Sequence, residues 1–95
     1  MERGYVYMLT NTYHTVLYTG VTSNLQKRIA EHRNKSFGGF SARYNLNIVV
    51  YFEELPNIVA AIEREKQIKD WSRAKKNKLV ESMNPQWEDL WERIQ

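Results

Sequence analysis

Six side chains along this sequence are of types that could together cut a phosphodiester bond. Two aromatic triplets near the N-terminus, Tyr5-Val6-Tyr7 and Tyr18-Thr19-Gly20, each supply a phenol. Hydrolysis of a phosphodiester needs an activated water, stabilised phosphoryl oxygens and help for the leaving alkoxide. A guanidinium, an imidazole, a carboxylate and an amide that could contribute follow at wider intervals: Arg28, His32, Glu65 and Asn77.

The two triplets lie in segments that predict a β-hairpin. Residues 4–10 and 16–22 are rich in β-branched and aromatic residues, and a polar stretch separates them. A loop of two or four residues centred between Thr12 and Tyr13 places Tyr7 directly opposite Tyr18 on one side of the sheet. Tyrosines are also ordinary strand residues that pack well, so a purely structural role is the alternative.

A first helix is predicted from Ser23 to about Asn34, with Ser23 as its N-cap and Gln26 completing a capping box. Leu25, Ile29 and His32 follow at helical spacing and define its buried stripe. Arg28 and His32 are one turn apart, so both side chains can reach one pocket. A core histidine, and an arginine that simply pairs with Glu65, are the structural alternatives.

Glu65 interrupts the apolar face of a second helix, which is predicted to start at Pro56-Asn57 and end near Trp71. On a helical wheel it falls in the middle of the arc formed by Ile58, Ala61, Ile62 and Ile68. A carboxylate turned inward must be paired, bound to a cation or protonated. Both a structural ion pair with an arginine and a role as metal ligand or general acid/base fit this position.

The other segments complete the expected architecture. Residues 47–53 predict a third strand that is covered on both faces, and residues 72–83 predict a third helix that Asn84-Pro85 ends. Residues 35–44 contain Gly38-Gly39 and predict a mobile surface loop. In the tail, an amphipathic turn that docks on the domain is indicated by the spacing of Trp87, Leu90, Trp91 and Ile94.

Composition predicts one globular domain over residues 1–95, with 42% hydrophobic residues and a net charge of +3. The sequence has no cysteine, which excludes a disulfide framework, a thiolate nucleophile and a zinc-thiolate site. No apolar run approaches membrane-spanning length and no secretion signal is evident, so we expect a soluble cytoplasmic protein. Basic residues that could contact phosphates are Lys35, Arg43, Lys75, Lys76 and Lys78.

The ordered set resembles the GIY-YIG nuclease superfamily, in particular its small, single-domain, excinuclease-like branch. The two triplets represent those of the family, although Tyr5 stands where the first usually begins with glycine and Thr19 replaces an isoleucine. Val21 stands where some relatives carry a lysine. Neither triplet departure removes a reactive group.

The resemblance also assigns the remaining residues. Arg28 matches the family arginine, and His32 occupies a helix position that relatives fill with histidine or tyrosine. Glu65 matches the metal-binding glutamate, and Asn77 matches the asparagine that often completes the site. Together with Tyr7 and Tyr18 they form the expected catalytic set.

By resemblance, the fold is α+β, with a three-stranded mixed or antiparallel sheet flanked by helices in the order β-β-α-β-α-α. The implied activity is that of a Mg²⁺- or Mn²⁺-dependent endonuclease or nickase. It would act on DNA, with RNA as an alternative, leave 3′-hydroxyl and 5′-phosphate ends, and belong to DNA repair. A monomer or weak dimer is expected, with no membrane partner.

Two other functions fit the sequence. One is a nucleic-acid-binding module of the same fold that cuts poorly and needs a protein partner for targeting. The other is a structural interaction domain that docks a protein through Trp87 and Trp91. Retention of all the polar positions argues against the last, whereas the modest charge leaves the binding module open.

Overall fold

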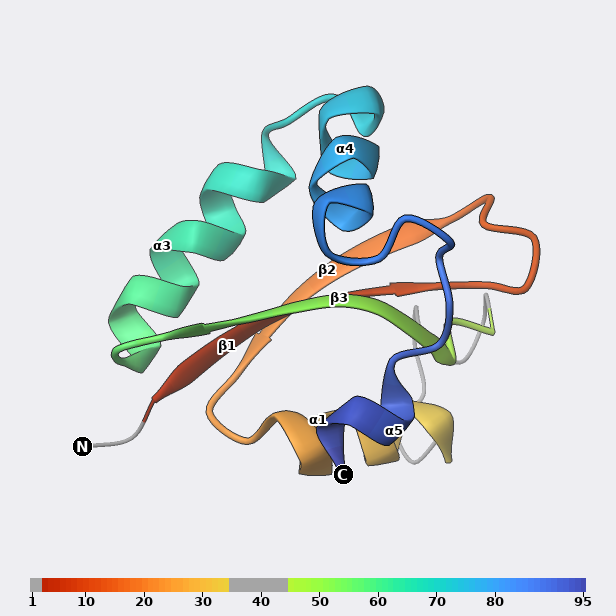
Figure 1. Ribbon diagram of the computed structural model, residues 1–95. Coiled ribbons are helices and arrows are strands. Elements are labelled where there is room, and N and C mark those ends of the chain that lie inside the picture. The colour runs from red at the N-terminus through yellow and green to blue at the C-terminus, as the bar shows by residue number, and fades with distance from the viewer. Residues whose placement is uncertain (1–2, 35–44) are drawn as a thin grey trace.

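The chain forms an α+β fold, and the computed structural model describes residues 3–34 and 45–95 of it (Figure 1). An antiparallel sheet with the strand order β2-β1-β3 contains three strands, β1 (Gly4–Thr10), β2 (Leu17–Thr22) and β3 (Ile48–Leu55). Its helices are α1 (Leu25–Arg33), α3 (Ile58–Lys69), α4 (Arg73–Met83) and α5 (Trp91–Ile94). The predicted fold class is therefore confirmed. The predicted surface loop, with Lys35 and Arg43, lies outside the described residues.

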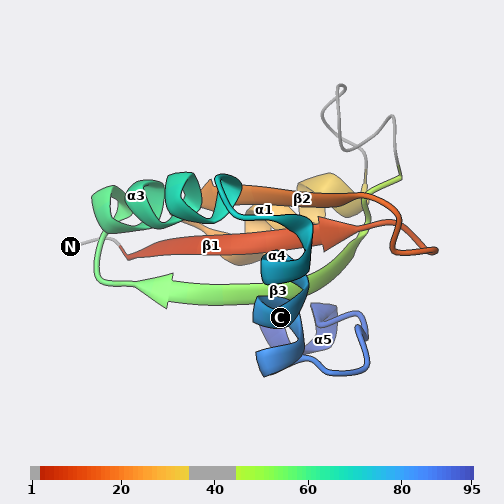
Figure 2. The same ribbon diagram turned by 90° about the horizontal axis from the view of Figure 1, so that it is seen from above.

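Helices cover both faces of the sheet. Successive side chains of a strand point to opposite faces, and in the central strand β1 both sets are buried. Val6 and Met8 belong to a cluster with Ile68 of α3, whereas Tyr7 belongs to a second cluster with Ile29 of α1. Figures 1 and 2 show α3 and α4 on one face and α1 and α5 on the other. A side chain of β1 therefore meets α1 or α3 according to whether its position is odd or even.

The hairpin between β1 and β2 has a different register from the predicted one. Tyr7 lies opposite Gly20, and Tyr18 lies opposite Leu9, so the prediction that Tyr7 directly faces Tyr18 is wrong. The connection contains six residues rather than two or four, because Thr10 pairs with Leu17. An even-length loop preserves the face on which each residue lies. The two tyrosines are therefore diagonal neighbours on the same side of the sheet.

Side-chain caps set where the helices begin. Asn24, and not the predicted Ser23, caps α1 by accepting a hydrogen bond from the Lys27 backbone N–H. Asn57 caps α3 and Ser72 caps α4, so both helices begin close to their predicted starts. The buried stripe of α1, with Leu25, Ile29 and His32, is also confirmed.

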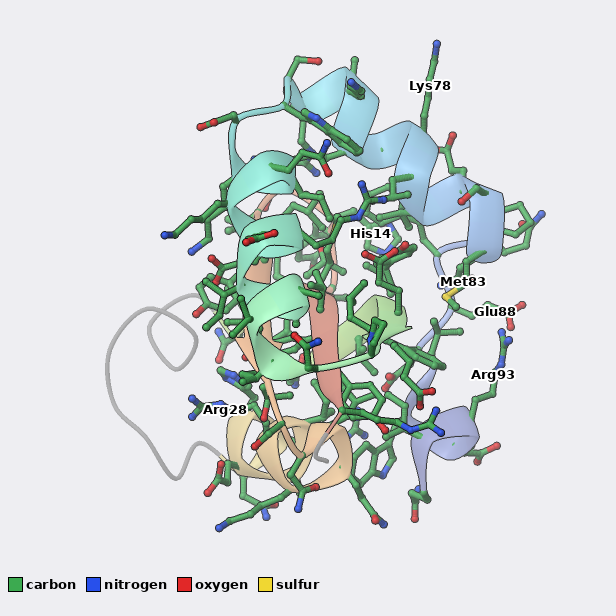
Figure 3. All side chains as sticks on the ribbon, turned by 90° about the vertical axis from the view of Figure 1, so that its left-hand side faces the viewer. His14, Arg28, Lys78, Met83, Glu88 and Arg93 are labelled. Atoms are coloured by element: carbon green, nitrogen blue, oxygen red, sulfur yellow. The ribbon has the colours of Figure 1, made fainter. Side chains whose placement is uncertain are left out.

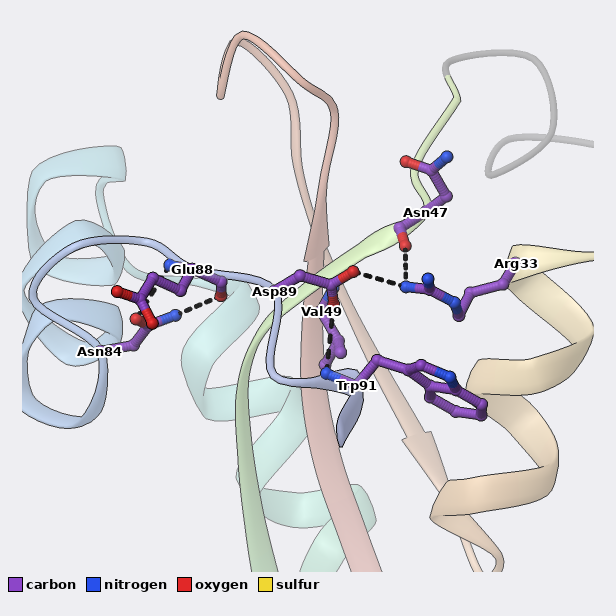
Figure 4. A network of polar contacts seen from close by, with 7 residues as sticks. All are labelled: Arg33, Asn47, Val49, Asn84, Glu88, Asp89 and Trp91. Atoms are coloured by element: carbon purple, nitrogen blue, oxygen red, sulfur yellow. Dashed lines mark hydrogen bonds and ion pairs between the residues drawn. The ribbon is translucent and has the colours of Figure 1, made fainter. Parts of the chain in front are cut away.

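The C-terminal segment folds back onto the sheet through a buried asparagine. The Asn84 side chain donates a hydrogen bond of 3.1 Å to the Val50 carbonyl oxygen. It also donates one of 2.7 Å to the Glu88 carbonyl oxygen and accepts one from the Glu88 backbone N–H (Figure 4). Six residues on, the Leu90 N–H donates to the Val49 carbonyl at 2.8 Å. These bonds fasten the end of α4 and the segment after it to β3.

An ion pair then ties this segment to α1. The Asp89 carboxylate lies 2.6 Å from the Arg33 guanidinium, which also donates to the Asn47 carbonyl and lies over the Trp91 ring (Figure 4). Leu90, Trp91 and Ile94 pack on the side of α1, but Trp87 packs with the cluster on the opposite face. The predicted docking of this segment is therefore confirmed, but Trp87 does not share one face with the other three residues, because the helix spans only residues 91–94.

Within the described residues, none of the helices has the length and apolar character needed to cross a lipid bilayer.

Candidate active site

A buried tyrosine and a buried histidine form the centre of the candidate site. Tyr7 of β1 is 1% exposed and His32 of α1 is 9% exposed. The Tyr7 hydroxyl oxygen lies 3.0 Å from His32 Nε2, so either group can donate the hydrogen bond, depending on the imidazole tautomer. His32 Nδ1 is buried and has no hydrogen-bond partner in the described part of the chain. The pair thus lies in the interface between the sheet and α1.

Gly20 allows the Tyr7 ring to occupy this position. A methyl group on Gly20 would overlap the Cζ, Cε2 and hydroxyl atoms of Tyr7, so the ring lies against the bare backbone of β2. A glycine in a strand often marks such a close approach. Gly20 of the second triplet is therefore required by Tyr7 of the first.

Tyr18 completes a cluster of three rings. Its ring centroid lies 6.4 Å from that of Tyr7 and 6.1 Å from that of His32, and the Tyr7 and His32 centroids are 5.7 Å apart. Unlike its two neighbours, Tyr18 is half-buried. Of the two phenols, Tyr18 is therefore the more accessible to water or a ligand.

Burial keeps Tyr7 and His32 uncharged near neutral pH. It raises the pKa of Tyr7 above its usual value, and the neighbouring Tyr18 and Glu65 raise it further, while the Arg28 cation lowers it. The pKa of His32 is lowered, first by burial and then by the charge of Arg28, with Glu31 acting in the opposite direction. Charged groups from α1 and α3 therefore both act on the ring cluster.

The cation and the carboxylate beside the rings come from different helices. Arg28 on α1 is partly exposed, and its guanidinium lies 3.9 Å from the Glu31 carboxylate. Figure 3 shows Arg28 on the side of the molecule where α3 lies. The side chain of Glu65 on α3 is 15% exposed, and its carboxylate lies 3.3 Å from the Lys69 ammonium one turn later. Glu65 thus forms an ion pair with a lysine of its own helix.

The prediction for the α3 helix face is partly wrong. Ala61 and Ile68 are buried as expected, but Ile62 is 37% exposed. The buried stripe of α3 is therefore narrower than the apolar pattern predicts, and Glu65 lies beside it.

The side chains that could bind a metal suit a hydrated hard cation such as Mg²⁺ better than a structural metal ion held by several protein ligands. In the described part of the chain, no three His, Asp or Glu side chains gather into a metal-binding group. Mg²⁺ commonly keeps several waters and binds one or two carboxylates together with substrate phosphates. The largely buried carboxylate of Glu65 meets that requirement.

Asn77 lies in a second polar arrangement, which includes an arginine that the sequence analysis did not single out. The Asn77 side-chain oxygen accepts a hydrogen bond of 2.9 Å from Arg73 Nε. The other two guanidinium nitrogens of Arg73 donate to the backbone carbonyls of His14 and Thr15, at 2.7 and 3.2 Å. Arg73 therefore links Asn77 to the hairpin loop. Its spacing of four residues from Asn77 was the available sequence signal.

The basic residues of α4 differ in their surroundings. The Lys75 ammonium lies 4.2 Å from the centre of the Trp71 ring, a cation–π contact. Lys76 is half-buried, whereas Lys78 points into solvent (Figure 3). Of these three lysines, Lys78 is the most available to a phosphate.

The chain is similar in sequence to a known catalytic domain and to proteins of other organisms. The GIY-YIG catalytic domain matches residues 3–78, which include both tyrosine triplets and Asn77. A UPF0213 protein of Syntrophus aciditrophicus is 36% identical over 87 residues, covering 90% of this chain and 98% of that protein. A UPF0213 protein of Natronomonas pharaonis is 41% identical over 80 residues, covering 80% and 88%.

A solved structure is similar in both sequence and fold. The solution NMR structure of a UPF0213 protein from Bacillus halodurans has a TM-score of 0.57 and 28% identity to this chain, with 92% of each chain covered. GIY-YIG nucleases typically use a divalent metal, and a nuclease-like domain implies a nucleic-acid partner. The chain therefore belongs to the GIY-YIG family and, with these relatives, to the UPF0213 proteins.

Proposed function

We propose that this protein is a divalent-metal-dependent endonuclease or nickase that hydrolyses phosphodiester bonds in DNA and leaves 3′-hydroxyl and 5′-phosphate ends. The observation that carries the proposal is the cluster of Tyr7, Tyr18 and His32, on which the charges of Arg28 and Glu65 act. Membership in the GIY-YIG family supports the same chemistry.

Each residue has a role that follows from its surroundings. Glu65 would hold Mg²⁺ or Mn²⁺, which when bound neutralises charge on the phosphate. The planar guanidinium of Arg28 grips two oxygens of the scissile phosphate. Asn77 donates from its amide nitrogen to the phosphate or to water, while Arg73 occupies its oxygen.

Proton transfer is assigned to the half-buried phenol. The attacking water forms a bond to phosphorus while the P–O3′ bond breaks. Tyr18 accepts the proton of this water, because its side chain is the accessible one of the pair, and the leaving 3′ oxygen takes a proton from solvent. A phenol acts as a base only as its phenolate, which nearby positive charge favours. Tyr7 and His32 remain neutral and hold the Tyr18 ring in place by packing.

Nicking of a supercoiled plasmid tests the proposal. We expect Mg²⁺- or Mn²⁺-dependent nicking that falls by at least about 100-fold in Tyr18→Phe and in Glu65→Gln, since each removes a group that acts in the reaction. Matched controls are Tyr5→Phe on the same face of β1 and Glu63→Gln on the exposed side of α3. Nicking that persists in Tyr18→Phe and Glu65→Gln would identify a contaminating nuclease and contradict the proposal.

The basic segment of α4 favours a second candidate, a binding module that cuts poorly. Residues 73–78 contain four basic residues and no acidic one, namely Arg73, Lys75, Lys76 and Lys78. Retention of plasmid or RNA in a gel shift, without metal-dependent nicking, would support this alternative. The same gel shifts, run with DNA and with RNA, show which nucleic acid the protein binds more tightly.

A further inference from the structure

The tip of the hairpin between β1 and β2 presents an aromatic ring to solvent. Tyr13 is 84% exposed, more than the other large hydrophobic side chains that are exposed in the described residues, Val59 at 62% and Ile62 at 37%. A single exposed apolar residue is ordinary. The loop that carries Tyr13, however, is ordered by hydrogen bonds from the Asn11 side chain and by contacts with Arg73 and Trp87.

Hydrogen bonds from one side chain shape the loop. The Asn11 side-chain oxygen accepts from the backbone N–H groups of Thr15 and Val16, at 2.8 and 3.2 Å, while its amide nitrogen donates to the Thr15 hydroxyl. The His14 N–H closes a turn onto the Asn11 carbonyl at 3.0 Å, and His14 takes a positive φ of 58°. Residues 12–14 are thereby held at the outer end of the loop.

Two other parts of the chain anchor the same loop from outside. The Arg73 guanidinium donates to the carbonyl oxygens of His14 and Thr15, and the His14 ring lies 5.1 Å from the Trp87 ring. Figure 3 shows His14 lying beside α4. Ordering a loop in advance lowers the entropy lost on binding. The backbone that carries Tyr13 is therefore held in place beside Arg73, at the start of α4.

This combination suits an unpaired nucleic-acid base. Proteins that bind single strands pair a positively charged surface with aromatic rings on which bases stack. Residues 73–78 supply the positive charge, and Tyr13 supplies the ring. Tyr18, the proposed proton acceptor in catalysis, follows on the same hairpin as the second residue of β2. In an intact duplex the faces of internal bases are covered by their neighbours, so they cannot stack on Tyr13.

We propose that Tyr13 is a stacking residue for an unpaired base, so that the protein prefers single-stranded or locally unpaired nucleic acid to intact duplex. The proposal rests on the proposed function only in taking nucleic acid as the ligand. It gives the substrate of the active site a defined class and gives the hairpin tip a role in selecting it.

Fluorescence anisotropy with the full chain tests the proposal in the presence of EDTA, so that no cleavage occurs. The probes are a fluorescein-labelled 15-nucleotide oligothymidine and a duplex of the same length. We expect Tyr13→Ala to weaken binding of the single strand by about 5- to 150-fold, the range for one stacked base, and to leave duplex binding within about twofold. Tyr13→Trp should retain single-strand binding.

The matched control is Val59→Ala, which shortens an exposed apolar side chain on α3 and should leave both affinities unchanged. Equal weakening for both probes, no change for either, or no single-strand binding by the parent protein would overturn the proposal. Because metal is withheld, the result is independent of catalysis. Tyr13-dependent binding without nicking would contradict only the endonuclease, whereas nicking with Tyr13-independent binding would contradict only the stacking role.

Discussion

Tyr7 is better suited to keep its proton than to take one from water. It is buried, and the charges of Glu65 and Glu31 add to the rise in its pKa, with Arg28 opposing them. Its partner His32 resists protonation for the same reason, since burial disfavours a charged imidazole. The hydrogen bond between these neutral groups pairs the Tyr7 hydroxyl with His32 Nε2 without placing a charge in the core. The role of base in the proposed reaction therefore falls to Tyr18.

The neutral state of His32 predicts a loss of stability in acid. Its folded-state pKa is lowered, whereas in the unfolded chain it lies near the ordinary value of about 6.5. As the pH falls below that value, the unfolded chain binds a proton that the folded chain does not, so the free energy of unfolding decreases until the folded pKa is passed. We expect this decrease to be smaller in His32→Gln, as measured by urea unfolding at several pH values from about 7 to 5.

The second histidine provides the control for that measurement. His14→Gln removes the other histidine of the sequence, which lies on the hairpin loop, and its acid slope is compared with that of His32→Gln. If His32→Gln lost stability as steeply as the parent protein, the buried imidazole would not be the source of the slope.

The hairpin shows what alternation of residue types can and cannot predict. The pattern gives the bounds of β1 and the face on which Tyr7 and Tyr18 lie, because side chains alternate along a strand. It does not give the loop length, because the Asn11 side chain replaces backbone pairing with its own hydrogen bonds to Thr15 and Val16. With such a loop, the partner of Tyr7 can change by two positions, from Tyr18 to Gly20, while every side chain stays on the same face of the sheet.

The hydrogen bond from Asn84 to β3 leads to a prediction about the stability of the fold. The side-chain amide of Asn84 donates to the Val50 carbonyl, and Asn84 is only 5% exposed, so water has little access to replace this hydrogen bond. Asn84→Ala leaves that carbonyl unpaired, so we expect the free energy of unfolding to fall by about 1–3 kcal/mol. Chemical denaturation measures the change directly.

Ser82 on the same helix is a matched comparison. Its hydroxyl donates to the Leu79 carbonyl in an exposed position, where water can replace the bond. Ser82→Ala should therefore change the free energy of unfolding by less than about 0.5 kcal/mol. Equal losses in the two variants would show that burial of Asn84 contributes nothing.

Across the whole molecule, the candidate site draws on both faces of the sheet. Tyr7 and His32 lie on the α1 face, while Glu65 comes from α3 on the other face and still acts on the Tyr7 phenol. The sequence predicted the inward stripe of α1 and the inward position of Glu65 from helical spacing. It could not predict the clamp of Arg73 on the hairpin loop, because that contact joins residues 58 and 59 positions apart.

The modest net charge of +3 conceals a concentration of positive charge on α4. Each lysine that neutralises a phosphate releases a counterion, so the logarithm of the affinity falls with the logarithm of the salt concentration. Lys78 points into solvent, whereas Lys75 is held over Trp71. Solvent-exposed Lys78 is therefore the better phosphate contact.

If α4 contacts the phosphate backbone, Lys78→Gln should lower the magnitude of this salt slope by about 1, measured by anisotropy on one oligonucleotide at a series of salt concentrations. Lys75→Gln should change the slope less, because its ammonium is already engaged by the indole. Lys66→Gln on the exposed side of α3 removes the same charge elsewhere and serves as the control. An unchanged slope in Lys78→Gln, or an equal change in Lys66→Gln, would mean that net charge rather than the α4 surface attracts the nucleic acid.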